Sequence, residues 1–174
     1  MEKKTVFFLL IIGVMAGGLF SQSLTQIVYI INKAVPEVKN IAILYNHSNK
    51  ETIEKDARTA SFATQKKISA YGIKTKSDIP AALDGISLLK NVAVIVIADE
   101  VHLNAESVKY TTQKLGLKNI PVVSTRPGDT AQNAFLCVVR KDDNIEIHVN
   151  KTVAAALKIT LTEDFLAECT LDRP

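Results

Sequence analysis

Residues 91–100 read NVAVIVIADE, and this stretch decides the fold class. Apolar residues fill positions 92–98 without interruption, and the run ends at two acids, Asp99 and Glu100. A strand with one face in water alternates apolar and polar residues, whereas a short unbroken run rich in valine and isoleucine is typical of a strand buried on both faces. A buried helix, the alternative, needs a longer run. The stretch therefore predicts the central strand of a parallel sheet that has helices on both sides.

Helix and strand patterns alternate on either side of this strand. The other expected strands are residues 39–45, 73–76 and 120–124, and the expected helices are residues 24–34, 48–71, 81–89 and 105–115. The second helix is expected to begin at a capping box formed by Ser48 and Glu51 and to end at Gly72. Strand–helix–strand units in succession require parallel pairing with right-handed crossovers.

The last part of the chain has a different pattern. Residues 134–140 and 145–149 predict a β-hairpin, and the alternation in IEIHV indicates an edge strand with one wet face. A helical turn is expected at residues 153–157, and Thr160 with Glu163 is expected to cap a last short helix. The chain is therefore expected to form a three-layer, flavodoxin-like α/β domain, with a mostly parallel sheet and a C-terminal β-hairpin at its edge.

The N-terminus resembles an export signal. Lys3 and Lys4 precede an apolar run at residues 5–20, and small residues follow it. We expect residues 1–23 to be a signal peptide that is cleaved after Ser21 or Ser23, which predicts a periplasmic location. An uncleaved membrane anchor is the alternative. Residues 24–174 would then form a single domain.

Composition excludes one class of partner. The chain has 21 Lys and Arg against 18 Asp and Glu, no basic block and 6% aromatic residues, so it offers neither a phosphate-binding surface nor a base-stacking platform. We expect no binding of nucleic acid. Two cysteines, Cys137 and Cys169, could form a disulfide in an oxidising compartment or remain two buried thiols.

Polar residues follow three of the expected parallel strands, where open α/β sheets bind their ligands. The candidate ligand-binding residues are Asn46, His47, Ser48, Asp99, Glu100, His102, Ser124, Thr125 and Arg126. Helix N-termini at the first two loops add backbone N–H groups that suit an anion or a polar ligand. Helix capping explains Ser48 and Asn104 equally well, and Asp99 and Glu100 could be solvated residues at a strand end.

The sequence offers little for catalysis or for cofactors. It has no glycine-rich phosphate loop, no G-x-S-x-G turn and no HExxH pair. His47, His102 and Asp99 do not have the spacing of metal ligands on one element. We therefore expect a binding protein that is not an enzyme and uses no cofactor or metal.

One resemblance covers residues 36–129. The stretch PEVKNIAILYNHSNKETI at residues 36–53 looks like the start of a lobe in ABC-transporter substrate-binding proteins of the TrpX-like type, and NVAVIVIADE and KNIPVVSTRPGD are similar to strands that line the cleft of that family. The family closes two such lobes over a ligand. The resemblance implies that Asn46, Ser48, Asp99, Ser124 and Thr125 lie on the ligand side.

A second resemblance covers the tail. IEIHVNKTVAAALKITLTEDFL, residues 145–166, is similar to the end of the YfiR-like periplasmic regulators, which bind partner proteins such as the periplasmic part of membrane-bound diguanylate cyclases. The leading hypothesis is thus an exported single lobe that binds a small polar ligand. The alternative is a regulatory module that binds the periplasmic domain of a membrane-bound signalling protein. A homodimer is possible in either case.

Overall fold

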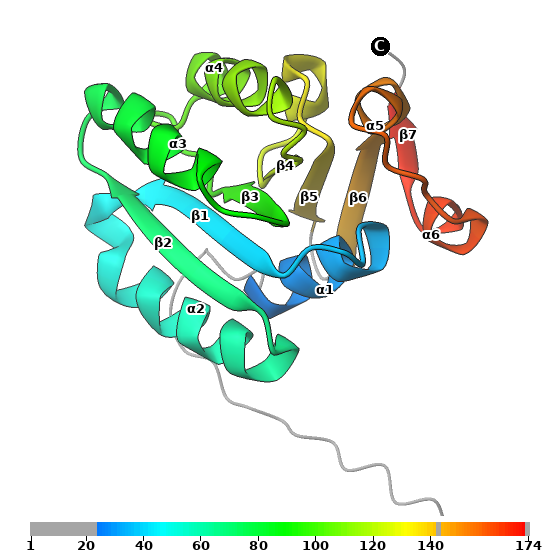
Figure 1. Ribbon diagram of the computed structural model, residues 1–174, viewed down its shortest axis with the longest axis horizontal. Coiled ribbons are helices and arrows are strands. Elements are labelled where there is room, and N and C mark those ends of the chain that lie inside the picture. The colour runs from blue at the N-terminus through cyan, green and yellow to red at the C-terminus, as the bar shows by residue number, and fades with distance from the viewer. Residues whose placement is uncertain (1–23, 142–143, 173–174) are drawn as a thin grey trace, which may run out of the picture.

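The computed structural model describes residues 24–141 and 144–172, which form one seven-stranded sheet between two layers of helices (Figure 1). The strand order is β2-β1-β3-β4-β5-β6-β7. The strands are β1 (Asn40–Asn46), β2 (Lys67–Ile73), β3 (Val92–Val96), β4 (Val122–Ser124), β5 (Leu136–Lys141), β6 (Asn144–Asn150) and β7 (Thr170–Asp172). Strands β1 to β5 are parallel to one another, β6 is antiparallel to β5, and β7 is parallel to β6. The three-layer α/β fold is confirmed, whereas the expected signal peptide lies outside the described residues.

Strand β3 is the buried strand that the sequence predicts. All five of its residues are buried, and it pairs in parallel with β1 on one side and β4 on the other. Successive side chains enter opposite helical layers, with Ile95 in one core cluster and Val94 and Val96 in the other. Burial on both faces explains why no polar residue interrupts the run.

Six α-helices cover the two faces of the sheet within the described residues. They are α1 (Leu24–Ala34), α2 (Lys50–Thr64), α3 (Ile79–Ser87), α4 (Ala105–Gly116), α5 (Lys151–Ala156) and α6 (Glu163–Ala167). Three short 3-10 helices, η1 (His47–Asn49), η2 (Lys76–Asp78) and η3 (Asp129–Gln132), connect strands to helices or to the next strand. Residues of α1, α2, α5 and α6 join one core cluster, and residues of α3 and α4 join the other.

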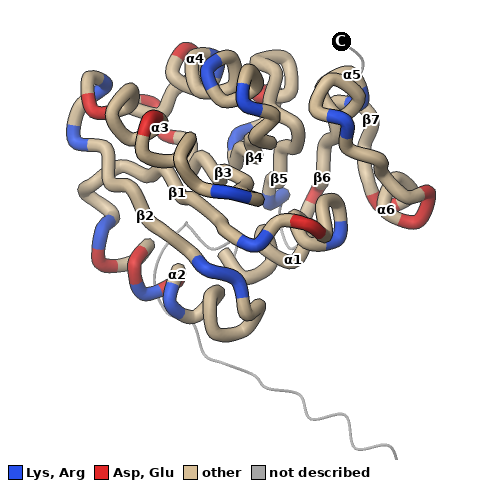
Figure 2. Tube along the Cα trace, viewed as in Figure 1, with Lys and Arg blue, Asp and Glu red and all other residues tan. Residues whose placement is uncertain are grey.

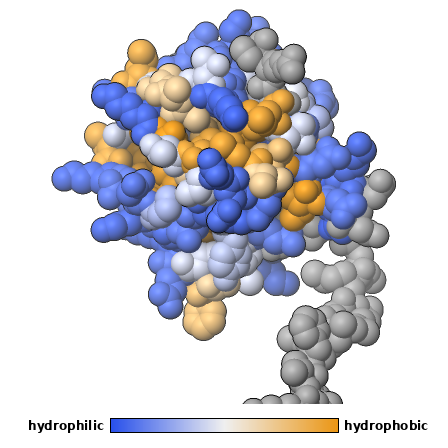
Figure 3. All heavy atoms as spheres, turned by 90° about the vertical axis from the view of Figure 1, so that its right-hand side faces the viewer, coloured by the Kyte–Doolittle hydropathy of each residue, from blue (hydrophilic) through white to orange (hydrophobic). Residues whose placement is uncertain are grey.

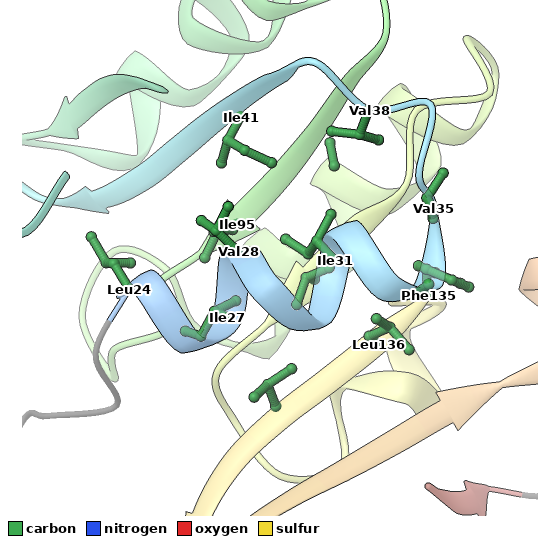
Figure 4. Packing of buried hydrophobic residues seen from close by; sticks show 14 of the residues in the cluster. Leu24, Ile27, Val28, Ile31, Val35, Val38, Ile41, Ile95, Phe135 and Leu136 are labelled. Atoms are coloured by element: carbon green, nitrogen blue, oxygen red, sulfur yellow. The ribbon is translucent and has the colours of Figure 1, made fainter. Parts of the chain in front are cut away.

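Helix α1 begins and ends where its apolar spacing predicts. Its five residues at helical spacing are all buried: Leu24, Ile27, Val28, Ile31 and Ala34. Figure 4 shows this row lying over Ile41 of β1, Ile95 of β3 and Leu136 of β5. Complete burial of one such side chain contributes about 1.5–3 kcal/mol, so this row fixes α1 on the sheet.

The second helix differs from the prediction. Helix α2 ends at Thr64, and Gln65 turns the chain with a left-handed φ of 55°. Residues 67–71, expected as helix, instead belong to β2, which pairs in parallel with β1 along its whole length. The strand expected at residues 73–76 therefore lies at residues 67–73 and shares only Ile73 with the prediction. The expected capping box is wrong as well, because Asn46 accepts the hydrogen bond from the Ser48 N–H and Asn49 precedes α2 without a side-chain cap.

The hairpin of β5 and β6 is confirmed, but β6 is not the edge strand. Strand β7 pairs with His148–Asn150 of β6 and forms the sheet edge. Thr162, rather than Thr160, caps α6 by accepting a hydrogen bond from the Phe165 N–H at 3.3 Å. Figure 3 shows apolar residues gathered in the middle of the face that carries these last elements, with hydrophilic residues around them.

The structure also shows the state of the two cysteines and whether any described helix could span a membrane. Cys137 is buried in β5 and Cys169 is half-buried, and both are thiols rather than a disulfide. Within residues 24–141 and 144–172, no helix is long and apolar enough to span a bilayer.

Candidate functional site

The three predicted loops lie side by side at the carboxyl edge, the edge of the sheet where β1 to β5 end. The strand register places Val96 of β3 between Leu44 of β1 and Ser124 of β4. The Ile97 N–H donates to the Leu44 carbonyl at 2.9 Å, and the Ala98 N–H donates to the Thr125 hydroxyl at 3.1 Å. The pairing therefore continues past the strand ends and brings the three polar loops together.

The loop after β1 is a closed turn that leads through η1 into α2. Asn46 Oδ1 accepts hydrogen bonds from the Ser48 N–H at 3.1 Å and from the Ser48 hydroxyl at 2.9 Å. Asn49 provides no side-chain cap for α2, and the N–H of Lys50, the first residue of α2, donates to the His47 carbonyl. Asn46 and Ser48 thus shape the turn, and Asn46 caps the helical segment that follows β1.

His47 and Tyr45 pack against Gly72 of β2. A Cβ at Gly72 would lie 2.8 Å from His47 Nδ1 and 3.0 Å from the Tyr45 hydroxyl, so a larger residue here would require these side chains to move. Burial, followed by the negative charge of Glu54, raises the pKa of Tyr45. Glycine at this position therefore holds the first loop close to the neighbouring strand.

Asp99 has one satisfied and one unsatisfied carboxylate oxygen. Its Oδ1 accepts hydrogen bonds from the N–H groups of Val101 at 2.6 Å, His102 at 2.7 Å and Leu103 at 3.4 Å. Its Oδ2 is buried and has no hydrogen-bond partner among the described residues. A buried carboxylate oxygen without a partner costs free energy, so it is a natural place for a donor group of a ligand.

Ser124 and Arg126 are both held by Asp129, which is only 2% exposed. The Ser124 hydroxyl donates to Asp129 Oδ2, and Arg126 donates from Nε at 3.0 Å and from Nη2 at 2.8 Å to Asp129 Oδ1. Arg126 is partly exposed, so this buried carboxylate orients the guanidinium while part of it still faces solvent. Sequence reasoning missed Asp129, although an acid directly after the turn glycine Gly128 was the available signal.

The remaining predicted residues contribute less to the site. Glu100 is exposed, and the backbone carbonyl of His102 accepts a hydrogen bond from the Ser107 hydroxyl at 2.7 Å. Across the described part of the chain, no group of His, Cys, Asp and Glu side chains could hold a metal ion. Asn104 caps α4 by accepting a hydrogen bond from the Ser107 N–H at 3.2 Å, as the capping interpretation predicts.

A cavity of about 500 Å³ lies at the opposite edge, the amino edge, where β1, β3 and β4 begin. Sequence reasoning did not anticipate it. Its lining includes Glu37, Asn91, Lys118, Asn119 and Lys158, together with apolar side chains. Parallel α/β sheets bind ligands at the other edge, so the three predicted loops remain the candidate site.

Comparison with known proteins identifies a fold but no family. No protein-family model and no curated protein matches the chain. Three similar solved structures are a conserved domain protein from Vibrio cholerae (TM-score 0.74, 17% identity), an ABC domain in complex with L-Trp from Streptococcus pneumonia (0.72, 17%) and the ligand-free, open form of a substrate-binding protein with adhesive properties from Clostridium difficile (0.70, 16%).

These matches cover 84–86% of this chain but only 58–60% of the solved chains. The chain thus spans less than two thirds of the length of the proteins it resembles. The likeness shows that this chain has the fold of substrate-binding proteins, in agreement with the first resemblance, and it gives no support to the YfiR-like resemblance of the tail.

Proposed function

We propose that this chain is an exported, non-enzymatic binding protein that holds a small polar ligand at the carboxyl edge of the sheet. The ligand would lie between the loops that follow β1, β3 and β4. One observation carries the proposal: Asp99 Oδ2 is buried without a hydrogen-bond partner among the described residues, at the edge where folds of this class bind ligands.

Arg126 and Asp99 define the chemistry of the ligand. The partly exposed guanidinium of Arg126, which Asp129 orients, attracts a negative group, such as a carboxylate. Asp99 instead accepts a hydrogen bond from a donor such as an ammonium group. A compound that carries both groups, as an amino acid does, suits this arrangement.

The solved structures support this choice in one respect. One of them holds L-Trp, which has both a carboxylate and an ammonium group, and its fold matches 86% of this chain. That structure is the reason to test L-Trp first.

The test measures ligand binding by thermal shift and by titration calorimetry with a panel of L-amino acids, beginning with L-Trp. Asp99→Asn is the informative variant, because the amide keeps an oxygen for the three backbone N–H groups and replaces Oδ2 with a donor. We expect it to lower affinity about ten- to a hundredfold, which corresponds to the loss of one charged hydrogen bond, about 1.5–3 kcal/mol.

Asp84→Asn is the matched control, since Asp84 lies on α3 with its side chain 68% exposed. It should bind as tightly as the wild type. If no amino acid stabilises the wild-type protein, this ligand class is wrong. If Asp99→Asn binds as tightly as the wild type, the carboxyl edge is not the site.

A further inference from the structure

Helix α2 carries an exposed stripe that the proposed function does not use. Glu54, Arg58 and Phe62 follow one another at intervals of four residues, so their side chains lie along one side of the helix. Phe62 is 92% exposed, the largest exposed fraction among the exposed large apolar side chains of the described residues. An exposed phenylalanine contributes little to the core, and its ring can contact a partner outside the chain.

The stripe borders a groove between α2 and the edge strand β2. The groove has a volume of about 500 Å³, and its apolar lining residues are Ala57, Phe62, Ile68 and Ala70. Tyr29 of α1 lies near the same end of α2, because its hydroxyl donates to the Ala63 carbonyl at 3.2 Å, and it is 53% exposed. The exposed ring of Phe62 therefore lies beside an apolar groove, while Tyr29 contacts α2 from the side of α1.

The charges on this face are arranged symmetrically. Glu54 and Arg58 are one helical turn apart, and Figure 2 shows charges of both signs along α2. Glu54 approaches Lys50 at 3.9 Å, and Arg58 forms no ion pair within the described part of the chain. No charged residue occurs from Thr59 to Gln65. If a second copy of the helix packs in the antiparallel direction, Glu54 of one copy lies opposite Arg58 of the other. If it packs parallel and in register, like charges lie opposite one another.

We propose that a second copy of this chain packs against this face. The two α2 helices run antiparallel about a two-fold axis that passes between them, level with the midpoint between Glu54 and Arg58. Glu54 of each copy then faces Arg58 of the other, as an isologous interface requires. Phe62 lies about 9 Å along the helix from the axis, which is within the length of a helix-to-helix contact, so the interface also covers Phe62.

The test measures the molar mass of protein produced from the full-length sequence, by sedimentation equilibrium over a range of concentrations. We expect a dimer for the wild type. Glu54→Arg and Arg58→Glu should each weaken it by about tenfold or more, because each places like charges opposite one another. The double variant, Glu54→Arg with Arg58→Glu, should recover the wild-type dimer because it restores opposite charges.

Phe62→Ser gives an independent measurement that leaves the core intact. It should weaken the dimer by about tenfold or more, since the ring is lost from the covered face. Leu117→Ser is the matched control, because Leu117 follows α4 and is 84% exposed, and it should leave the dimer unchanged. Circular dichroism of each variant checks that it is folded.

Three results would overturn the proposal. The first is a wild-type protein that is monomeric at every concentration, which would assign Phe62 to a different partner. The second is a dimer that persists in Phe62→Ser. The third is a double charge variant that dimerises no better than either folded single variant.

Discussion

The chain turns by different means at the two edges of the sheet. At the carboxyl edge, side-chain oxygens accept hydrogen bonds from backbone N–H groups, as Asn46, Asp78, Asp99 and Asn104 do. At the amino edge, the backbone itself turns through left-handed conformations at residues other than glycine. These residues, with φ between 50° and 63°, are Gln65, Asn91, Asn119, Asn133 and Lys158.

The difference follows from the direction of the helices. Helices that connect parallel strands begin at the carboxyl edge, where their first N–H groups need acceptors, and end at the amino edge, where the chain must reverse. Helix α5 tests the rule, because it follows the antiparallel strand β6 and begins at the amino edge. Its cap, Asn150, accepts a hydrogen bond from the Val153 N–H at 3.0 Å. The acceptor thus follows the helix start rather than one edge of the sheet.

The largest expected effect comes from breaking the side-chain network of the carboxyl edge. Asp129→Ala would leave Ser124 and Arg126 without their shared acceptor, and we expect it to lower the free energy of unfolding by about 2–4 kcal/mol. Denaturant titration measures this. Asp84→Ala, which removes only an exposed contact at 3.6 Å from Lys114, should change stability by less than about 1 kcal/mol. Equal losses in the two variants would contradict the buried role of Asp129.

A smaller effect of opposite sign is expected at the amino edge. Lys158 has a φ of 59°, which glycine adopts without a steric penalty. Lys158→Gly should therefore raise the free energy of unfolding by about 0.5–1 kcal/mol. Thermal unfolding checks the sign. Lys109→Gly, inside α4, is the control and should lower stability by a similar amount. A loss of stability in Lys158→Gly would mean that the lysine side chain outweighs the strain of its backbone.

The smallest effect depends on pH. Hydrogen bonds from the backbone N–H groups of Thr75 and then Lys74 lower the pKa of Asp78. A carboxylate with a lowered pKa stabilises the fold above its unfolded pKa of about 4, and this contribution disappears as the pH falls through the folded value. We expect the melting temperature of Asp78→Asn to fall less than that of the wild type as the solution is acidified below pH ~4. Parallel curves for the two proteins would show that the cap carries no such linkage.

Elements with one consistent pattern could be predicted from the sequence. Helix α1 was predicted residue by residue because five apolar residues at helical spacing leave a single choice of face. Strand β2 was missed because Ile68 and Tyr71 are three residues apart and fit a helix as well as a strand. The residue that ends α2, Gln65, carries no local stop signal. Strand β7, three residues long, depends on its contact with β6 rather than on its own sequence.

The candidate site shows the same limit. Adjacency of the three loops follows from parallel strands alone, and the hydrogen bonds that join residues 97, 98 and 125 to neighbouring segments confirm it. The partners of Ser124 and Arg126 could not be predicted, because they depend on how η3 folds Asp129 back under the loop. The adjacency of the loops was therefore predictable from strand patterns, whereas local side-chain bonding was not.

The contact between Gly72, Tyr45 and His47 offers a marker for finding related sequences. A side chain at position 72 would collide with both neighbours, and the three positions are fixed relative to one another by the pairing of Tyr45 with Gly72. A homologue that retains tyrosine and histidine at the end of its first strand should retain glycine in its second.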